Sequence, residues 1–519
     1  MSWQPEVDEI ARRRAWAREN ADAGSMARYR AQGWKTVRER IDLLADPGSF
    51  QEIGQLAGNV KYKDGQAVSA TPAGFKMGLA EINGRPVVIG GDDFSVRGGS
   101  TSGYRSKGGH SGFSGDLAYE YQIPLVNLYH GSGGSVTSVR SRGHAVYPGS
   151  NTSQHFVELL GRVPVVSAVM GTSAGGPAGR AVLSHFSVMV RGTSQLFASG
   201  PPVVKRALGI DISKEDLGGA KVAVDQAGTI DNAADTEEEC LALVRRFLSY
   251  MPLNVWELPP RVETDDPPTR ADEALLKVVP KNPRTPYDMK RIVRMVVDRD
   301  SFFEIQPTFG RAIICGLARM DGYVVGVIAN TPMVNGGAID GPAARKQTRM
   351  IDLCDTFNIP ILFLVDAPGF AIGPAAESAG ALREGMRCLQ ARMQATVPML
   401  SVVVRRSFGF GGFVTRDNMG LDFKVAWPSA QIGSLPLEGG VLAAYRREIE
   451  AAPDPEARQR EIEEEIRIAS SPMRMAEVFA LEDVIDPRET RAYLCRFVRA
   501  MQGRLRNTLG IKGRVGPRV

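Results

Sequence analysis

The chain has 519 residues, of which 43% are hydrophobic and 23% are charged, a composition typical of globular proteins with about two to four domains. Its formal net charge of +5 is small for this length, which argues against a nucleic-acid-binding protein because such proteins need a strongly basic surface. The first residues lack the apolar core of a signal peptide, and no apolar run approaches the roughly 18–20 residues of a membrane span. We therefore expect a cytoplasmic protein that binds neither nucleic acid nor membrane.

The five cysteines include no C-x-x-C pair, so neither a disulfide framework nor a metal site is expected. Glycine is the unusual residue, since the chain holds 56 against an average usage of about 7%. Many of them stand in Gly-Gly pairs, which are typical of backbone that turns tightly or approaches a neighbour closely.

In chain order, residues 1–45 have the pattern of a helical arm, with an apolar stripe that includes Trp34, Ile41 and Leu44 and ends at an Asp-Pro-Gly turn. Short Val/Ile-rich runs then alternate with Gly-rich turns and helical stretches, which predicts an α/β fold. The Pro-rich segment 257–286 predicts an extended connection between two domains, 46–256 and 287–519.

The two predicted domains resemble each other in sequence. Three segments match in order: 85–99 with 323–337, 122–134 with 358–370, and 162–176 with 396–410. Pro124 then corresponds to Pro360, and Pro164 to Pro398, at nearly the same spacing. Agreement of order and spacing indicates two homologous halves.

Gly171-Thr172-Ser173-Ala174-Gly175 matches the G-x-S-x-G nucleophile elbow of serine hydrolases. Such an enzyme needs an acid and then a histidine downstream, but only His185 follows Ser173, within the same predicted helix. A nucleotide-binding loop is also disfavoured, because the G-x-x-x-x-G-K motif is absent and both Gly-x-Gly runs continue to Val136 or Val414 where a dinucleotide fingerprint needs Gly.

Each half retains one junction in which an apolar strand runs through a Gly-rich turn into a helix, at 167–179 and at 401–413. Unpaired peptide N–H groups and the positive end of the helix dipole converge at such a point, and glycine lets a ligand oxygen approach. Two such junctions predict two oxyanion holes, of the kind that stabilises a thioester carbonyl as it becomes an enolate. The alternative is that the glycines only allow strand and helix to pack closely.

At this point the chain resembles the carboxyltransferase (β) subunits of biotin-dependent acyl-CoA carboxylases, the group that includes the propionyl-CoA and methylcrotonyl-CoA enzymes. The residues that carry the resemblance include RIDLLADPGSF (40–50), GRPVVIGGDDFSVRGGS (84–100), SAGGPAG (173–179), LFASGPPVVK (196–205), DTFNIPILFLVDAPGF (355–370), AWPSAQI (426–432) and EDVIDPRETR (482–491). Together they extend over most of the chain.

The resemblance implies a tandem crotonase-like α/β fold, with one β-β-α superhelix in each half, which agrees with the internal repeat. It implies a homohexamer built from dimers, with each active site between the N-half of one subunit and the C-half of its partner. It also implies that the N-half binds acyl-CoA and the C-half binds biotin.

The resemblance further implies which residues form the site. The N-half oxyanion hole is expected at Gly175 and Gly176, and the C-half hole within Gly409, Phe410 and Gly411, with its register open by one or two residues. The substrate-binding residues expected by the same resemblance are Gly133, Gly134, Ser173, Ala174, Lys346 and Arg349. For Lys346 and Arg349, charges on a solvated helix are the alternative.

The expected reaction moves CO2 from carboxybiotin to the α-carbon of an acyl-CoA, a carboxyltransferase step that forms a C–C bond. Biotin is expected on a separate biotin carboxylase or carrier subunit, because the chain has no Ala/Val-Met-Lys-Met run. No metal is expected in this subunit. Side chains need not act as general base, since backbone dipoles and the cofactor supply the chemistry in such a mechanism.

Three of the positions that depart from the family pattern are Ala223, Ala227 and Glu384, which stand where many members have His, Ser and His; the run from Gly131 to Val136 also departs, since many members have Asp-Ser-Gly-Gly-Ala-Arg there. The sequence does not name the acyl group, and these changes leave a biotin-independent acyl-CoA decarboxylase, or a non-catalytic assembly subunit, as alternatives. The end of the chain, 491–519, holds eight Lys or Arg and no Asp or Glu. We expect this basic stretch to pack subunits, to dock the biotin subunit or to lie near CoA phosphates, the alternative being a solubilising tail.

Overall fold

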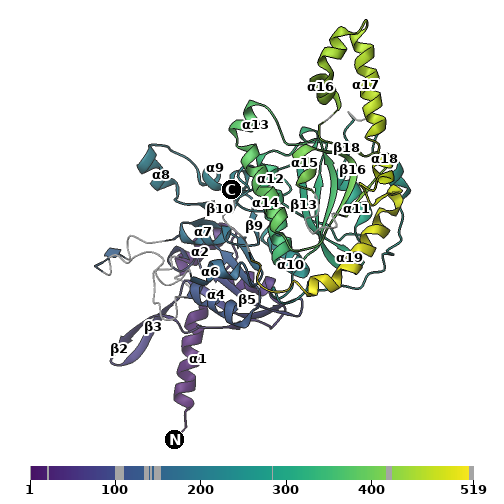
Figure 1. Ribbon diagram of the computed structural model, residues 1–519. Helices are drawn as coiled ribbons and strands as arrows, with labels where there is room; N and C mark the ends of the chain where they lie inside the picture. The colour runs from purple at the N-terminus through teal and green to yellow at the C-terminus, as the bar shows by residue number, and fades with distance from the viewer. Residues whose placement is uncertain are drawn as a thin grey trace. The chain divides into compact units, whose positions relative to one another are not determined.

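The computed structural model describes residues 2–19, 23–99, 110–133, 139–140, 143–144, 154–282, 285–415, 423–435 and 437–513. The chain divides into two units, 1–255 and 256–519 (Figure 1). Among the described residues, no helix combines the length and the apolar character needed to cross a bilayer.

Unit 1 begins with three helices, α1 (Gln4–Glu19), α2 (Ala23–Ala31) and α3 (Val37–Leu44). The helix α3 starts at a capping box, in which the Thr36 side chain accepts from the Glu39 N–H and the Glu39 carboxylate accepts from the Thr36 N–H. Of the predicted apolar stripe, Ile41 and Leu44 are fully buried. The helix α1 instead leaves Ile10 40% exposed.

A seven-stranded sheet forms the centre of unit 1. Its order is β1 (Gln51–Glu52), β4 (Phe75–Ile82), β5 (Arg85–Asp92), β6 (Leu125–Tyr129), β7 (Val165–Val169), β9 (Phe186–Val190) and β11 (Asn232–Ala234). The first three strands are antiparallel and those from β5 onward are parallel. Every residue of β6, β7 and β9 is buried, as expected of parallel strands that are covered on both faces.

The structure describes further elements of unit 1 outside this sheet. They are the hairpin β2 (Gly58–Lys63) and β3 (Gln66–Pro72), the parallel pair β8 (Thr172–Ala174) and β10 (Gln195–Phe197), and the helical segments η1 (Arg97–Gly99), α4 (His110–Tyr121), α6 (Gln154–Leu159), α7 (Gly176–Val182), α8 (Pro201–Leu208), α9 (Lys214–Gly218), η3 (Lys221–Gln226) and α10 (Glu237–Tyr250).

Unit 2 repeats the arrangement with an eight-stranded sheet. Its order is β12 (Phe303–Ile305), β13 (Ile313–Met320), β14 (Tyr323–Asn330), β15 (Ile361–Ala367), β16 (Met399–Phe408), β17 (Lys424–Ala426) and β19 (Asp483–Val484), with β18 (Gln431–Gly433) paired to β16. Again the first three strands are antiparallel and the following ones are parallel.

Equivalent backbone hydrogen bonds occur within each of the two sheets. Pro124 O accepts from the N–H of Val88 at 2.9 Å in unit 1, and Pro360 O accepts from the N–H of Gly326 at 2.9 Å in unit 2. Pro164 O and Pro398 O accept in the same way from the first residues of β6 and β15. The prolines matched in the sequence therefore hold equivalent positions, and the prediction of two homologous α/β halves is confirmed.

Helices pack on both faces of the unit 2 sheet (Figure 1). The helical segments that the structure describes in unit 2 are η4 (Glu273–Leu276), α11 (Met289–Val296), η5 (Asn335–Gly337), α12 (Gly341–Thr356), α13 (Pro374–Ser378), α14 (Ala381–Gln394), α15 (Gly409–Phe413), α16 (Leu437–Ala451), α17 (Pro455–Ala469), α18 (Pro472–Glu477), η6 (Pro487–Glu489) and α19 (Thr490–Arg506). The helices α11 and α19 bury Ile292, Val296 and Val498 in one core cluster with Leu362 of β15 and with Trp427, which directly follows β17. The helices α16 and α17 form a hairpin that extends away from the sheet of this unit.

Two segments for which the sequence predicts a role make internal contacts in the structure. The Pro-rich segment 257–286 belongs to unit 2 and is packed there: Asp266 is 2% exposed, and its backbone carbonyl accepts from Arg491 at 2.9 Å. The basic C-terminal stretch also pairs internally, since Arg491 binds Asp298 at 2.8 Å and Arg499 binds Asp321 at 2.6 Å. These two arginines therefore have internal partners, and the roles expected of the stretch in packing subunits, docking the biotin subunit or lying near CoA phosphates stay predictions.

Candidate active site

The N-half junction lies at the carboxyl end of β7, where the chain turns through Gly175 into α7. Gly175 has φ 62° and ψ −123°, a conformation that residues with a Cβ rarely adopt. Its N–H donates to Phe197 O at 3.2 Å, so this donor is occupied. The N–H of Gly176 opens α7 and has no backbone acceptor within the part of the chain that is described. Of the two predicted donors, the geometry leaves Gly176 available for a ligand oxygen.

Gly133 lies directly against this junction. A Cβ added at Gly133 would lie 3.1 Å from Ala174 O and 3.2 Å from Gly176 N, so the absence of a side chain keeps the space beside the Gly176 N–H open. The structure thus brings Gly133, Ala174, Gly175 and Gly176 together. Gly134, predicted alongside them, lies outside the described residues.

Ser173 does not act as a nucleophile in this geometry. Its side chain is fully buried, and its hydroxyl has no hydrogen-bond partner among the residues whose positions are described. His185 is engaged elsewhere, with Nδ1 accepting from the Val165 N–H at 3.0 Å and Nε2 lying 2.9 Å from Leu160 O. The hydrolase alternative therefore lacks a base, and the Ser173 hydroxyl does not reach a ligand surface.

His130 follows β6 directly and lies under the loop that holds Gly133. Its ring stacks on Phe94, with centroids 4.2 Å apart, and meets Trp34 edge-on at 4.6 Å. Burial, and then the charge of Arg40, hold the pKa of His130 well below its usual range. A neutral imidazole enclosed by aromatic rings supports the loop and does not serve as a general base.

Asp92 stands beside His130 at the end of β5 and is 1% exposed. One carboxylate oxygen accepts from the His130 N–H at 3.3 Å, and the other, Oδ1, is buried without a partner among the described residues. Burial raises the pKa of Asp92 to about 6. The sequence did not predict the contact between Asp92 and His130. The two consecutive aspartates that end an apolar strand could have drawn attention to it, because a buried carboxylate is unusual.

The C-half junction lies at the end of β16, where the chain enters α15. Gly409 has φ 53° and stands at the position that the internal repeat matches to Gly175. The N–H groups of Phe410 and Gly411 have no backbone acceptor within the described ranges. The Phe410 side chain is 54% exposed, and its ring lies parallel to that of Phe370 with centroids 6.5 Å apart. The three predicted residues thus form one turn whose peptide donors lie next to the exposed ring of Phe410 and the half-buried ring of Phe370.

Lys346, predicted to bind substrate, is occupied by contacts within the fold, which disfavour that role. Lys346 is 2% exposed on α12, and its ammonium group donates to Gln306 O at 2.6 Å, Phe309 O at 3.2 Å and Ile313 O at 2.8 Å. An ammonium group has three N–H donors, so all are used to hold the segment that leads into β13 and the first residue of that strand. Burial lowers the pKa of Lys346. Arg349 lies half-buried on the same helix, and its ligand role stays a prediction.

The three positions that depart from the family pattern have different surroundings. Ala223 is 4% exposed and belongs to the core that covers β7 and β9. Ala227 is exposed at the end of η3. Glu384 is half-buried in the first turn of α14, 3.6 Å from Arg387. Among the described residues, no group of three or more His, Cys, Asp or Glu could hold a metal ion.

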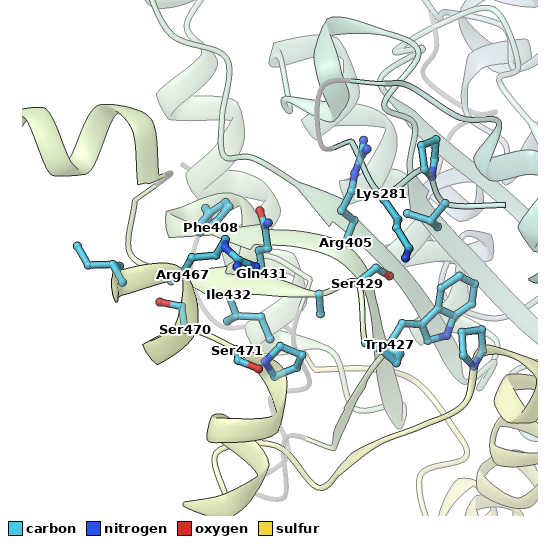
Figure 2. A pocket seen from close by; sticks show the side chains of 18 of the residues that line it. Lys281, Arg405, Phe408, Trp427, Ser429, Gln431, Ile432, Arg467, Ser470 and Ser471 are labelled. Atoms are coloured by element: carbon cyan, nitrogen blue, oxygen red, sulfur yellow. The ribbon is translucent and has the colours of Figure 1, made fainter. Parts of the chain in front are cut away.

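Figure 2 shows a cavity of about 660 Å³ in unit 2, between β18, the end of α17 and the segment before α11. The side chains of Lys281, Arg405 and Arg467 lie around it together with Phe408 and Trp427. None of the glycines predicted as catalytic lines this cavity, so the cavity is not the predicted C-half oxyanion site.

Two homologous α/β units, each with parallel strands that end in a glycine turn and a helix, define a tandem crotonase-like protein. A family model described as "carboxyl transferase domain" matches residues 28–514. The chain therefore belongs to the carboxyl transferase domain family.

The relatives and solved structures agree with this assignment. The chain is 36% identical to the propionyl-CoA carboxylase carboxyltransferase subunit of Haloferax mediterranei, over 97% of each chain. It is 35% identical to the methylmalonyl-CoA decarboxylase subunit alpha of Veillonella parvula, over 89% of each. Among solved structures, it is similar to transcarboxylase 12S with methylmalonyl-coenzyme A and methylmalonic acid bound, with TM-score 0.88, 29% identity and coverage of 100% and 97%.

Proposed function

We propose that this chain is the carboxyltransferase subunit of an acyl-CoA carboxylase and moves CO2 from carboxybiotin to the α-carbon of an acyl-CoA. The observation that carries the proposal is the glycine turn found in both units, at Gly175–Gly176 and at Gly409–Gly411. It occurs in a chain that aligns over 97% of its length with a propionyl-CoA carboxylase carboxyltransferase subunit.

In this function, unit 1 takes the acyl-CoA. The thioester oxygen is placed at the Gly176 N–H, in the space that Gly133 leaves open, and the α7 dipole adds positive potential there. A pre-oriented N–H donor stabilises the enolate oxygen more strongly than the neutral carbonyl, and one such donor is worth about 10²–10³ in rate. His130 and His185 stay engaged in the fold, so neither takes the α-proton.

Unit 2 fits a biotin ring. The N–H groups of Phe410 and Gly411 match a ureido oxygen, and the exposed ring of Phe410 beside the half-buried ring of Phe370 matches an apolar bicyclic ring. When bound as carboxybiotin, the cofactor supplies the CO2 and the base for the α-proton. The protein orients the two reactants and holds the developing charge.

The biotin group is carried on a separate subunit in this proposal, and the chain assembles as a homohexamer, a trimer of dimers. The solved transcarboxylase 12S, which covers the full chain, is described as a hexamer assembly. Size-exclusion chromatography with light scattering tests the assembly directly, and a stable monomer would contradict it.

The function is tested by a screen of short, branched and long acyl-CoAs with the cognate biotin subunit, in which ATP-dependent fixation of bicarbonate is measured. We expect at least one acyl-CoA to be carboxylated. If none is carboxylated by an assembled complex whose biotin subunit is charged with CO2, the proposed function is wrong.

A decarboxylase is the second candidate, favoured by the similarity to the methylmalonyl-CoA decarboxylase subunit alpha and by Glu384, which stands where many family members have His. The assay is release of CO2 from methylmalonyl-CoA by the purified chain without any biotin subunit. Release at a rate comparable to carboxylation would favour this candidate, and its absence would favour the carboxyltransferase.

A further inference from the structure

The end of β16 contains a bulge opposite Asp366. The parallel pairing of β15 and β16 continues to Val365 and Val403, and the next pair joins Ala367 to Ser407. Residue 366 therefore faces the longer stretch 404–406, which includes Arg405 and Arg406. A bulge of this kind redirects the strand that contains it. Here the redirected residues lead straight into the turn at Gly409.

The carboxylate of Asp366 binds both arginines of this bulge. Asp366 is fully buried. Its Oδ2 accepts from Arg405 Nε at 3.0 Å and from the Tyr287 hydroxyl at 2.9 Å. Its Oδ1 accepts from Arg406 Nε at 2.6 Å and from the Arg406 backbone N–H at 3.2 Å. One carboxylate thus fixes the side chains of the bulge and one of its peptide groups.

The two guanidinium groups extend this network to neighbouring segments. Arg405 donates to Thr285 O at 2.9 Å, and Arg406 donates to Gly336 O at 2.6 Å. The η5 turn that holds Gly336 also touches the backbone at Asp366, because a Cβ added at Gly337 would lie 2.5 Å from Asp366 O. The network therefore connects η5, β15 and β16 around one buried charge.

Both backbones that meet at the C-half turn leave from this network. Gly369 follows Asp366 on the same strand exit, and Gly411 follows the bulge of β16. A Cβ added at Gly411 would lie 2.7 Å from Gly369 Cα, so the two glycines are in direct backbone contact. We expect a movement of Asp366 relative to Arg405 and Arg406 to change the direction of the Phe410 and Gly411 N–H groups.

Unit 1 shares the backbone part of this arrangement and lacks the ionic part. The Asp366 N–H donates to Asn330 Oδ1 at 3.2 Å, and the equivalent His130 N–H donates to Asp92 Oδ2 at 3.3 Å. The internal repeat places Gly171 and Thr172 where unit 2 has its two arginines. The ionic network is therefore a property of the biotin side alone.

We propose that Asp366 is a positioning residue for the C-half oxyanion turn, and that it acts through Arg405 and Arg406 on the side that binds biotin. The proposal rests on the proposed function. Replacing the carboxylate with an amide keeps the size of the side chain but removes the negative charge that binds both guanidinium groups. The amide NH2 group would also face N–H donors, with which it cannot form a hydrogen bond.

The test compares Asp366→Asn with Asp298→Asn. Asp298 is also buried and also holds an arginine, Arg491 at 2.8 Å, but its other bonds are to the N–H groups of Asp321 and Gly322. Both variants lose a buried ionic contact, but only Asp366→Asn loses it next to the turn at Gly409. Arg406→Gln is a third variant, with the Arg406 side chain 18% exposed and therefore less costly to the fold.

Carboxyl transfer is measured from the carboxylated form of the best acyl-CoA to free biotin, a step in which a C–C bond breaks, an N–C bond forms and the ureido proton moves to the α-carbon. We expect Asp366→Asn and Arg406→Gln to raise the KM for biotin about tenfold or more and to leave the KM for the acyl-CoA within about twofold. Asp298→Asn is expected to change neither value.

Hydrogen exchange provides a readout apart from activity. Amides of residues 407–413 are expected to exchange faster in Asp366→Asn than in the wild type, and to be unchanged in Asp298→Asn. If Asp366→Asn fails to fold, Arg406→Gln decides. If the wild type is active, equal effects of Asp366→Asn and Asp298→Asn on both KM values and on hydrogen exchange would overturn the positioning role. An inactive wild type would instead overturn the proposed function, and this inference with it.

Discussion

Gly369 and Gly411 are in backbone contact, with a Cβ added at Gly411 placed 2.7 Å from the Cα of Gly369. The corresponding contact in unit 1 joins Gly133 to the peptide nitrogen of Gly176, 3.2 Å from an added Cβ. In both units a second loop thus lies against the turn that follows the central strand, and glycine at the contact keeps the peptide donors accessible.

Gly411→Ala is expected to abolish most carboxyl transfer. The added methyl group meets backbone atoms of Gly369, which have no flexible end that could move aside. We expect a fall in kcat of at least about 100-fold, the loss associated with one oxyanion donor. Gly503→Ala in α19 is the control, since nothing lies within 4 Å of its added Cβ. Activity near the wild-type level in Gly411→Ala would contradict the C-half assignment.

Gly176→Val tests the N-half donor without a packing defect. Nothing lies within 4 Å of a Cβ added at Gly176, so the protein should still fold and assemble as the wild type does, while the branched side chain covers the space beside the N–H. We expect kcat/KM for the acyl-CoA to fall about 10²–10³-fold. Gly179→Val on the same helix has equal space around it and should keep its activity. Unchanged turnover of Gly176→Val would exclude this N–H as the thioester donor.

Lys346→Met is expected to lower stability and to leave acyl-CoA binding intact. The substitution removes an ammonium group that satisfies three backbone carbonyls, and each buried acceptor left without a donor costs about 1–3 kcal/mol. The thermal midpoint should fall by several degrees, while the KM for the acyl-CoA stays within about twofold. A large rise in that KM with an unchanged midpoint would restore the ligand role that the sequence predicted.

Asp92 gives the stability of unit 1 a pH dependence of unusual sign. Burial raises its folded-state pKa to about 6, above the usual 3.8, so the folded state binds more protons than the unfolded state between these values. Stability contributed by the protonated form is present below about pH 4 and is lost as the pH rises through 6, by up to about 3 kcal/mol.

Asp92→Asn isolates this contribution. Unit 2 already has Asn330 at the equivalent position, with the same bond to a backbone N–H, so the amide fits the site. From pH 4 to pH 7, the stability of the wild type should fall relative to that of the variant, as measured by chemical denaturation at each pH. A constant difference over this range would show that Asp92 keeps an ordinary pKa.

Arg491→Met is expected to be among the most destabilising changes in the basic C-terminal stretch. Arg491 is 1% exposed and binds Asp298 together with the backbone carbonyls of Asp266, Pro267 and Val296. Loss of the cation leaves a buried carboxylate unpaired, at a cost of about 3–5 kcal/mol. Arg506→Met, at an exposed position of the same helix, serves as the control. Equal unfolding midpoints for the two variants would contradict the structural role.

The internal repeat made the fold predictable. Matched prolines mark where equivalent strands begin, and strand pairing repeats the same bonds because backbone hydrogen bonding depends on register more than on side-chain identity. The glycine turns were predictable for the same reason, since Gly175 and Gly409 are both required at positive φ.

The side-chain networks were not predictable in this way. Nothing in the sequence shows that the segment from Gln306 to Ile313 wraps over the Lys346 ammonium group, because the two lie in separate elements joined only by the fold. The role of Asp366 depends on a bulge, which appears only when two distant strands are paired. The two arginines before the turn were visible in the sequence, but their buried partner was not.

The hydrogen-bond donors of the turn at Gly409 are peptide N–H groups. The internal repeat aligns Gly176 of unit 1 with Phe410 of unit 2, so the side chain at this position differs while the peptide group is kept. Mutational surveys that truncate side chains to alanine measure what is lost when atoms are removed. Truncation to alanine leaves the peptide groups of a main-chain site in place. Such a site instead loses activity when a substitution adds atoms that block its N–H groups. Substitutions that enlarge the glycines, and leave the polar residues untouched, are therefore the informative set for mapping this enzyme.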